Sequence, residues 1–359
     1  MQVQKGNENK VITIYDIARE AGVSAATVSR VLTNSAKVRP EKRERVLQLV
    51  QKYNFTPNAL ARGLSDTRSK VIGILAADIR NPYYAELFVA CEQAAYEAGY
   101  TVLLMNTRGD KKQEGYLLGK LQEQRVDALI QLGGNVDALE TDVEYAKIVN
   151  QTMANTPVVV TGKLDETQCR MVRIDSTKAV DLLMEHLLSL GHQRIALIGG
   201  RMEVLATHEK FLRYRQILEL NGISYDPDLV AEDSAYDMIS GYRHMNRMFE
   251  KGVDLTAVIA VNDSAATGIM RSIFEHGYRI PEDISVVSYD NTYIAHLMIP
   301  ALTSVDYNYE EFGRKLVQTA IKTIEGEDMD TLQMVMPNLV VRESSGAVPE
   351  KKYNMKTSK

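Results

Sequence analysis

The sequence is poor in cysteine and contains no long apolar run. Its two cysteines, Cys91 and Cys169, stand alone, without a CxxC pair or a cluster. This argues against a disulfide framework or a zinc site and predicts two inert, buried thiols. No apolar stretch approaches the roughly 20 residues that span a bilayer, so no membrane association is expected. The opening MQVQKGNENK lacks the apolar core of a signal peptide, which predicts a cytoplasmic protein.

The motifs of the common enzyme classes are also missing. The sequence has no HExxH, GxxxxGK[ST], GxSxG or GxGxxG, and its 6 histidines are scattered. Gly133-Gly134 and Gly199-Gly200 each end a strand candidate, where a glycine pair is more often a turn than a phosphate cradle. Asp263 and Asp290 would form an acid/base pair without a nucleophile. We therefore expect no enzyme, no metal and no cofactor, but a binding cleft without chemistry.

Charge is distributed unevenly along the chain. Residues 1–70 carry 13 Lys and Arg against 6 Asp and Glu, a net charge of +7, while the remainder carries −12. A basic head on an acidic body indicates an anionic partner at the head. On charge alone, an ordinary solvated surface is an equally good explanation.

The basic head predicts three short helices. Thr13 and Asp16 form a capping-box pattern, Gly22 is a helix stop, and Ser24 is a good N-cap for the second helix. A third helix is expected to begin at Pro40. Two short helices at so tight a corner are typical of a helix-turn-helix.

The apolar residues of the head show which helix faces should be buried. The expected buried positions are Val28, Val31 and Leu32 in the second helix and Val46, Leu47, Val50 and Tyr53 in the third. The opposite face of the second helix is then free to enter a major groove, where Arg30 could read guanine and the alanines could touch thymine methyls. This face comprises Ser24, Ala25, Ala26, Thr27, Ser29 and Arg30. The alternative is a small helical bundle with a solvated face.

The stretch IYDIAREAGVSAATVSRVL resembles the DNA-binding signature of the lactose-repressor family, and the resemblance continues through YNFTPNALARGLSDTRSKVIGIL to about residue 344. It implies a small all-α head followed by an α/β body of two doubly wound parallel-sheet subdomains, like a periplasmic binding protein. The implied boundaries are 11–56 for the head, 57–70 for a hinge, 71–344 for the effector-binding and dimerisation domain and 345–359 for a disordered tail. The resemblance adds Thr13, Tyr15, Asn34 and Tyr53 to the DNA-binding residues.

The segment from 57 to 70 has two interpretations. Gly63 and the short length make it a poor helix, so the residues alone favour a flexible linker. The resemblance implies instead a hinge helix that folds when two copies meet on DNA. Leu64 would then wedge between base pairs in the minor groove, beside Asn58, Ala61 and Arg62.

The body alternates apolar strand candidates with amphipathic helices. The candidates are VIGILAA, TVLLM, VDALIQL, TPVVVTG, RIALIGG, TAVIAV and ISVVSYD. Such runs predict parallel sheets covered on both faces, and their number predicts two subdomains that change over near 173–176. The resemblance implies further crossings near 301–306 and 330–335. A helix over about 308–326 would return to the first subdomain, and the last strands would lie in the second.

Polar side chains follow several of these strands. They include Asp78, Asn262, Asp263, Asp290 and Asn291, and Asp175 follows the further apolar stretch MVRI. Ligands of open α/β sheets sit beyond the carboxyl ends of strands, although any one such residue is more often a helix cap. Carboxylates and amides beside aromatic rings suit a polyhydroxylated ligand.

The resemblance makes the effector site more specific. It implies effector contacts from Asp78, Tyr83, Tyr84, Asp175, Lys210, Tyr236, Asn262 and Asp290. Three residues depart from the family pattern: Lys210 stands where an effector-binding arginine is usual, and Arg213 and Ser288 stand where glycine is usual. Lysine offers a point charge instead of a planar fork, so the ligand of a known member cannot be transferred to this chain.

Together these features predict a homodimeric, ligand-responsive repressor of a pseudo-palindromic operator, nucleoid-associated when bound. Dimerisation is expected partly through the helix over 83–98. A sugar or sugar phosphate is the favoured effector, with a nucleobase or nucleoside as the alternative. Whether the ligand releases or recruits DNA binding stays open, as does a phosphocarrier protein as co-regulator. The competing classes are a periplasmic-type solute-binding protein and a nucleotide-dependent α/β enzyme.

Overall fold

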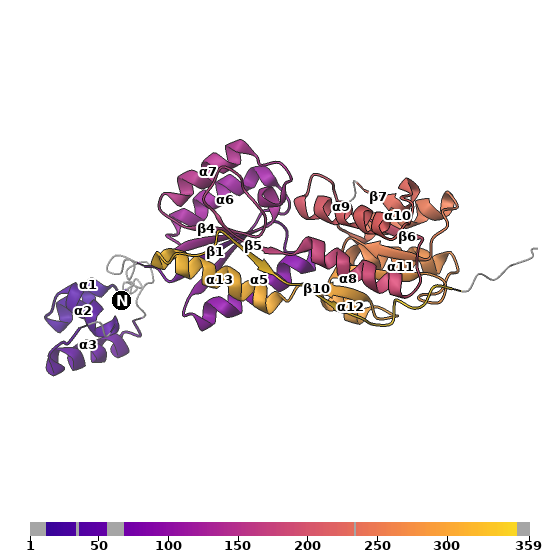
Figure 1. Ribbon diagram of the computed structural model, residues 1–359. Coiled ribbons are helices and arrows are strands. Elements are labelled where there is room, and N and C mark those ends of the chain that lie inside the picture. Colours follow the sequence, from indigo (N-terminus) through magenta and orange to yellow (C-terminus); the bar gives the residue numbers. More distant parts are fainter. Residues whose placement is uncertain (1–11, 34–35, 56–67, 233–234, 350–359) are drawn as a thin grey trace, which may run out of the picture. The chain divides into compact units, whose positions relative to one another are not determined.

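The computed structural model describes residues 12–33, 36–55, 68–232 and 235–349. The chain divides into two compact units, Met1–Ser69 and Lys70–Lys359, called here the head and the body (Figure 1). Within the described ranges, no helix is both long and apolar enough to cross a membrane.

The described part of the head consists of three helices, α1 (Ile14–Ala21), α2 (Ala25–Thr33) and α3 (Pro40–Lys52). The capping box at Thr13 and Asp16 is confirmed, since each side chain bonds the other residue's backbone N–H. Gly22 ends α1 in the left-handed conformation, with φ of 67°. The Ser24 Oγ accepts from the Thr27 N–H at 3.2 Å, so Ser24 caps α2 as predicted.

One small core holds the head together. Ile17 and Ala21 of α1, Val28 and Val31 of α2 and Val46 of α3 are all buried in it. The prediction for Leu47 is wrong: it is 44% exposed, and Leu49 is buried in its place. Position 49 lies three residues after Val46 and shares its helix face, whereas position 47 is turned by about 100°.

The first subdomain of the body contains a parallel sheet in the order β11-β5-β4-β3-β1-β2. Its strands are β1 (Val71–Ala76), β2 (Thr101–Asn106), β3 (Ala128–Leu132), β4 (Val158–Val160), β5 (Arg170–Ile174) and β11 (Leu332–Val335). Ile72 lies opposite Val102 on one side and Ala128 on the other. Both faces are buried, which explains why these strands read as continuous apolar runs.

Two pairs of helices cover this sheet. One face packs against α5 (Pro82–Glu97) and α13 (Tyr309–Glu325), which lie side by side (Figure 1). The other face packs against α6 (Lys111–Glu123) and α7 (Val143–Met153). A short 3₁₀ turn, η1 (Gly134–Asp137), follows β3 at the carboxyl edge.

The second subdomain repeats this architecture, with strand order β12-β10-β9-β8-β6-β7. The strands are β6 (Ile195–Ile198), β7 (Val230–Ala231), β8 (Ala257–Ala260), β9 (Ser285–Asp290), β10 (Thr303–Asp306) and β12 (Asn338–Val340), of which β12 runs antiparallel to β10. One face packs against α8 (Ser176–Ser189) and α9 (Leu205–Leu220), and the other against α10 (Met238–Glu250) and α11 (Asp263–Glu275). The short elements η2 (Pro227–Leu229) and α12 (Tyr293–Leu297) complete it. Two doubly wound subdomains are thereby confirmed.

The described body passes between its subdomains three times: from β5 to α8, from β10 to α13 and from β11 to β12. The expectation that all the last strands lie in the second subdomain is wrong for β11. It pairs with β5 in the first sheet. The Arg170 guanidinium of β5 also donates, at 2.7 Å, to the carbonyl of Met329, which lies shortly before β11 in the chain. The third crossing therefore follows residue 335.

Residues 345–349 were expected to belong to a disordered tail, and this expectation is also wrong. Ser345 bonds His186 at 2.8 Å, the Gly346 N–H donates to Ser285 at 3.0 Å, and the Val348 N–H donates to the carbonyl of Leu190. The rest of the proposed tail lies outside the described residues. Polar anchors on α8 and β9 hold this segment against the second subdomain.

Candidate functional site

The head presents one face of α2 to solvent. Val28 and Val31 are buried beneath it, while Ser24, Ala26 and Arg30 are exposed. Ala25, Thr27 and Ser29 are half-buried, and Ala25 packs against the core of the head. The Ser24 and Thr27 hydroxyls bond each other at 2.9 Å, which links them at the start of the helix. The geometry suits a recognition helix, because a rigid buried face holds a short polar face outward.

The other head residues that were expected to contact DNA differ in whether their side chains are exposed or already hydrogen-bonded within the head. Tyr15 is 72% exposed. The Thr13 hydroxyl is occupied in the α1 cap, donating to Asp16 at 2.6 Å. The Tyr53 hydroxyl donates to Glu20 at 2.7 Å, so it joins α3 to α1. Asn34, Asn58, Ala61, Arg62 and Leu64 lie outside the described residues.

In the body, tyrosines from several elements converge where the two sheets present their carboxyl ends. Tyr83 and Tyr84 form the first turn of α5, capped by Asn81. The Tyr83 ring meets Tyr84, Tyr307 and Tyr309 at centroid distances of 4.9, 5.9 and 6.0 Å. Burial raises the pKa of these tyrosines well above the usual value, so they remain neutral hydroxyl groups.

Asp137 of η1 belongs to the same cluster. The Tyr84 hydroxyl donates to its carboxylate at 3.0 Å. Burial raises the Asp137 pKa, while the bond from Tyr84 opposes the shift. The Tyr84 side chain packs closely against the backbone of Gly133, where an added Cβ would lie 2.3 Å from the Tyr84 hydroxyl oxygen. Glycine is therefore required here, and its φ of 77° makes the same demand.

Lys210 reaches into the cluster from α9. Its Nζ donates to the Tyr307 hydroxyl at 2.9 Å and lies 3.8 Å from the centroid of the Tyr289 ring. Burial lowers the Lys210 pKa, and the carboxylates of Asp290 and Glu209 act against that shift. Lys210 thus holds a buried ammonium between rings and carboxylates.

Asp290 and Asp263 lie behind this ammonium. Burial raises the pKa of both, and the charge of Asp263 raises that of Asp290 further. Asp263 accepts bonds from the Ser304 hydroxyl at 2.8 Å, from both the N–H and the hydroxyl of Thr292, and from Ser288. The unusual Ser288 is thereby explained, because its hydroxyl donates to a buried carboxylate.

Tyr236 and Asn262 complete the wall on the side of the second subdomain. The Tyr236 hydroxyl bonds Thr207 of α9 at 2.8 Å. Asn262 caps α11 by accepting from the Ala265 N–H at 2.8 Å, and its amide donates to the carbonyl of Tyr236 at 3.2 Å. Asn262 therefore fixes the position of Tyr236 as well as that of the helix.

Two of the expected effector residues are engaged elsewhere. Asp78 is bound by the Arg80 guanidinium, with its closest contact at 2.6 Å, which lowers the Asp78 pKa. Asp175 caps α8, accepting from the Lys178 N–H at 2.9 Å and the Thr177 hydroxyl at 2.7 Å. Arg213, where glycine is usual, pairs with Asp181 of α8, outside the tyrosine cluster.

Contacts between the subdomains close the cleft. Ala138 and Val204 form an isolated antiparallel bridge, and the Leu139 N–H donates to the carbonyl of Glu203 at 2.8 Å. Arg173 of β5 binds both carboxylate oxygens of Glu209 of α9, at 2.8 and 2.9 Å. The expected ligand residues Tyr83, Tyr84, Lys210, Tyr236 and Asp290 therefore surround a closed junction.

The sequence interpretation did not single out Asp137, Glu209, Tyr307 or Tyr309. Asp137 follows the strand VDALIQL by a few residues, so the strand-end rule could have identified it. Tyr307 and Tyr309 follow Thr303–Asp306, a stretch interpreted only as a crossing between the subdomains. Glu209 carried no local signal, because its partner Arg173 lies 36 positions away.

A helix-turn-helix head and a two-subdomain body closed over a polar cleft define a ligand-responsive DNA-binding protein. Comparison with known proteins agrees. Residues 13–58 match the model of the bacterial regulatory proteins of the lacI family, and residues 184–345 match that of the periplasmic binding protein-like domain. Catabolite control protein A of Priestia megaterium is 31% identical over 332 residues, which cover 92% of this chain and 97% of that protein. The chain belongs to the LacI family.

Solved structures show the same similarity. The lac repressor dimer bound to operator and the anti-inducer ONPF matches with a TM-score of 0.84 and 28% identity, covering 94% of this chain and 100% of that chain. The transcriptional regulator CelR in complex with cellobiose matches with a TM-score of 0.69 and 28% identity, covering 93% and 100%. The protein is thus a sequence-specific DNA-binding transcription regulator with a ligand-binding body, and not an enzyme.

Proposed function

We propose that the protein is a homodimeric repressor of a pseudo-palindromic operator and that a sugar or sugar phosphate in the cleft controls its affinity for DNA. It would act in the cytoplasm, on the nucleoid when bound. The observation that carries the proposal is the set of contacts across the cleft. The Ala138–Val204 bridge and the Arg173–Glu209 pair join the two subdomains beside the tyrosines.

The DNA-binding part of the proposal rests on the exposed face of α2. Arg30 would contact guanine, Ser24 and Thr27 would contact phosphate or bases at the helix start, and Ala25 and Ala26 would lie against thymine methyls. The twofold axis of a dimer would set the spacing of two half-sites. Leu64 and its neighbours are proposed as minor-groove contacts on the resemblance alone.

The ligand-binding part rests on the junction between the subdomains. A ligand that enters among Tyr83, Tyr84, Lys210, Tyr236 and Asp290 must rearrange the bonds that close it. The energetic coupling between ligand and operator is typically about 1–3 kcal/mol, and it acts in both directions. CelR was solved with cellobiose, which supports a sugar here.

Two apolar surfaces of the body support dimerisation. The exposed face of α5 includes Val89 and Tyr96. In the second subdomain, a groove of about 630 Å³ is lined by α11 and the segment before β10, with Phe274 and Ile299 79% and 94% exposed. Large exposed apolar groups of this kind mark contact surfaces.

A mobility-shift assay with genomic fragments tests the proposal. The full chain should shift a subset of fragments at about 100 mM salt, where phosphate contacts are partly screened. Arg30→Ala should weaken the shift about tenfold or more through the loss of base contacts. Arg19→Ala on α1 is the control, since Arg19 lies outside the proposed reading face.

Ligands are then added to the protein–DNA complex. Sugars or their phosphates should change the fragment affinity about fivefold or more, consistent with coupling of this size. The repressor proposal fails if no fragment shifts specifically with or without ligand. A response to purines but to no sugar would replace the ligand class and keep the DNA-binding role.

A further inference from the structure

Three cations at the cleft lie beside carboxylates of the chain itself. Arg173 binds Glu209 with a side chain only 18% exposed. The charge of Glu209 also favours the ammonium of Lys210, so this carboxylate serves one cation from each subdomain. At the rim, Arg201 pairs with Glu203 at 3.5 Å. Each of these cations is therefore already neutralised by a carboxylate and is not available to pair with an anionic ligand.

Three buried carboxyls also belong to this site. Asp263 and Asp290 are buried within the second subdomain, and Asp137 lies on the first. Burial raises the pKa of all three carboxyls, so this surrounding disfavours negative charge, and a phosphate would bring in about two further negative charges.

The groups left without partners suit hydroxyls. Among the residues that the structure describes, the hydroxyls of Tyr289 and Tyr309 are buried without a hydrogen-bond partner. The carboxyl of Asp290 lies beside Tyr307 and Tyr309. A sugar hydroxyl can accept from a tyrosine and donate to a carboxylate at once, whereas a fully ionised phosphate can only accept.

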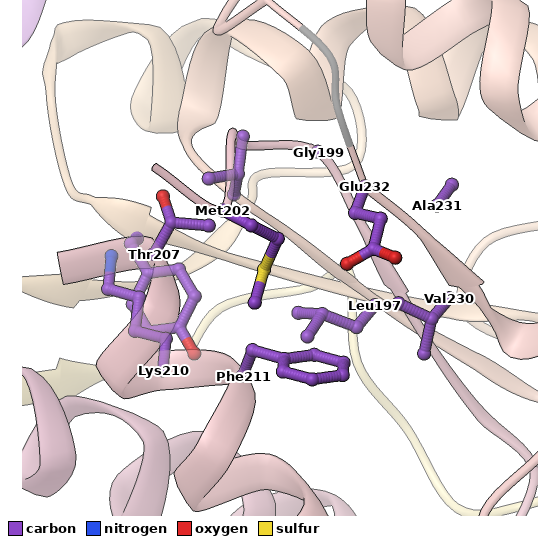
Figure 2. A pocket seen from close by; sticks show the side chains of 11 residues that line it. Leu197, Gly199, Met202, Thr207, Lys210, Phe211, Val230, Ala231 and Glu232 are labelled. Atoms are coloured by element: carbon purple, nitrogen blue, oxygen red, sulfur yellow. The ribbon is translucent and has the colours of Figure 1, made fainter. Parts of the chain in front are cut away.

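The space behind Lys210 is equally restrictive. Figure 2 shows Lys210, Thr207 and Phe211 of α9 around a small cavity with Met202 and Glu232. Tyr289 also lines this cavity, whose volume is about 20 Å³. That is room for about one water-sized group, such as a hydroxyl.

We propose that Glu209 determines ligand specificity: as a built-in anion between Arg173 and Lys210, it restricts the cleft to uncharged, hydroxyl-bearing ligands and excludes phosphorylated ones. This rests on the proposed function, whose sugar or sugar phosphate it narrows to the neutral form. Glu209 acts on the ligand through Arg173 and Lys210, so it is a positioning residue.

Titration calorimetry on the full chain tests this with neutral sugars and their phosphate esters in matched pairs, among them glucose with glucose 6-phosphate and fructose with fructose 1,6-bisphosphate. For any pair that binds, the neutral member should bind about tenfold more tightly or better. Glu209→Gln should reduce this preference at least severalfold by releasing Arg173. Glu203→Gln removes a rim carboxylate that does not touch Arg173, so it should leave the preference unchanged.

Inorganic phosphate is the second probe and needs no knowledge of the sugar. It should raise the melting temperature of Glu209→Gln by about 2 °C or more beyond its effect on wild type and Glu203→Gln, because only that variant gains an anion site. Comparing variants cancels phosphate binding to the head.

Each outcome has a distinct meaning. The inference is overturned, and the proposed function kept, if wild type prefers the phosphate ester or if Glu209→Gln leaves both readouts unchanged. If no sugar or ester binds while specific DNA binding is intact, the sugar ligand itself is lost, and the inference with it.

Discussion

Glu114 is the buried carboxylate that fixes the turn beside the cleft. It accepts from the Asn135 N–H and side-chain amide and from the Gln131 amide, at 2.8 to 3.2 Å. This holds η1, which carries Asp137 and leads into the Ala138 bridge. Burial raises the Glu114 pKa from 4.5 to about 7, despite these hydrogen bonds.

A raised pKa means that the folded protein holds this proton more tightly than the unfolded chain. The resulting stability is fully present below about pH 4.5 and is lost as pH rises through about 7. Glu114→Gln removes the titration, so its unfolding free energy relative to wild type should improve by about 2 kcal/mol between pH 4.5 and 7.5.

Urea unfolding followed by circular dichroism at both pH values measures this difference. Glu123→Gln, which removes an exposed carboxylate at the end of the same helix, is the control. Other buried carboxylates are common to all the proteins and cancel. A difference that is flat with pH would contradict the assignment of the proton to Glu114.

At the scale of elements, glycine allows helices to touch. An added Cβ at Gly268 of α11 would lie 1.9 Å from the carbonyl oxygen of Met238 on α10. Since that atom is backbone, the whole helix would have to move. Gly268→Ala should therefore lower the unfolding free energy by about 2 kcal/mol.

Gly119 of α6 offers the matched control, because a Cβ there meets nothing within 4 Å. Gly119→Ala should be neutral or stabilise by up to about 1 kcal/mol through helix propensity. Chemical denaturation of both variants gives the comparison. Equal effects would show that the tight α10–α11 contact does not limit stability.

The elements show which parts of the fold could be read from sequence. β1, β3, β8 and β9 were predicted because strands buried on both faces are apolar throughout. β7, with the two residues Val230–Ala231, is too short to carry a pattern. The burial of Leu47 was predicted wrongly because α3 contains two nearby leucines, Leu47 and Leu49. The apolar pattern of so short a helix does not decide which of the two faces the core.

The candidate site divides in the same way. Asn262 and Asp290 were predicted because they come at the ends of apolar strands. Glu209 was not predicted, because its ion pair is with an arginine of the other subdomain. Asp78 and Asp175 satisfied the same strand-end rule, yet Arg80 and the α8 N-terminus occupy their carboxylates. A local pattern locates the edge of a sheet but not the partner across a cleft.

At the scale of the whole molecule, the exposed groove around Phe274 should hold the dimer together. Phe274→Asp would place a charge in an apolar contact, so the variant should sediment as a monomer at micromolar concentration in analytical ultracentrifugation. Operator affinity should fall about tenfold or more, since two linked heads no longer bind together. Ligand affinity should persist.

Leu220→Asp is the control, because Leu220 is 71% exposed on α9, away from the groove. It should remain dimeric and bind DNA normally. If Phe274→Asp also stays dimeric, then the groove is not the contact surface, and the face of α5 becomes the one to test.

The interleaved path of the body also matters while the chain is being made. The first subdomain is incomplete until α13 and β11 have been synthesised, which requires translation through residue 335. The second subdomain is incomplete until β12, which ends at Val340, has been synthesised. Neither subdomain can be completed before nearly the whole polypeptide has emerged from the ribosome. The N-terminal helices contain all their own partners by residue 55, so they can fold while the remainder is still being translated. A nascent chain would thus carry a folded DNA-binding head well before the ligand-binding body that regulates it has folded.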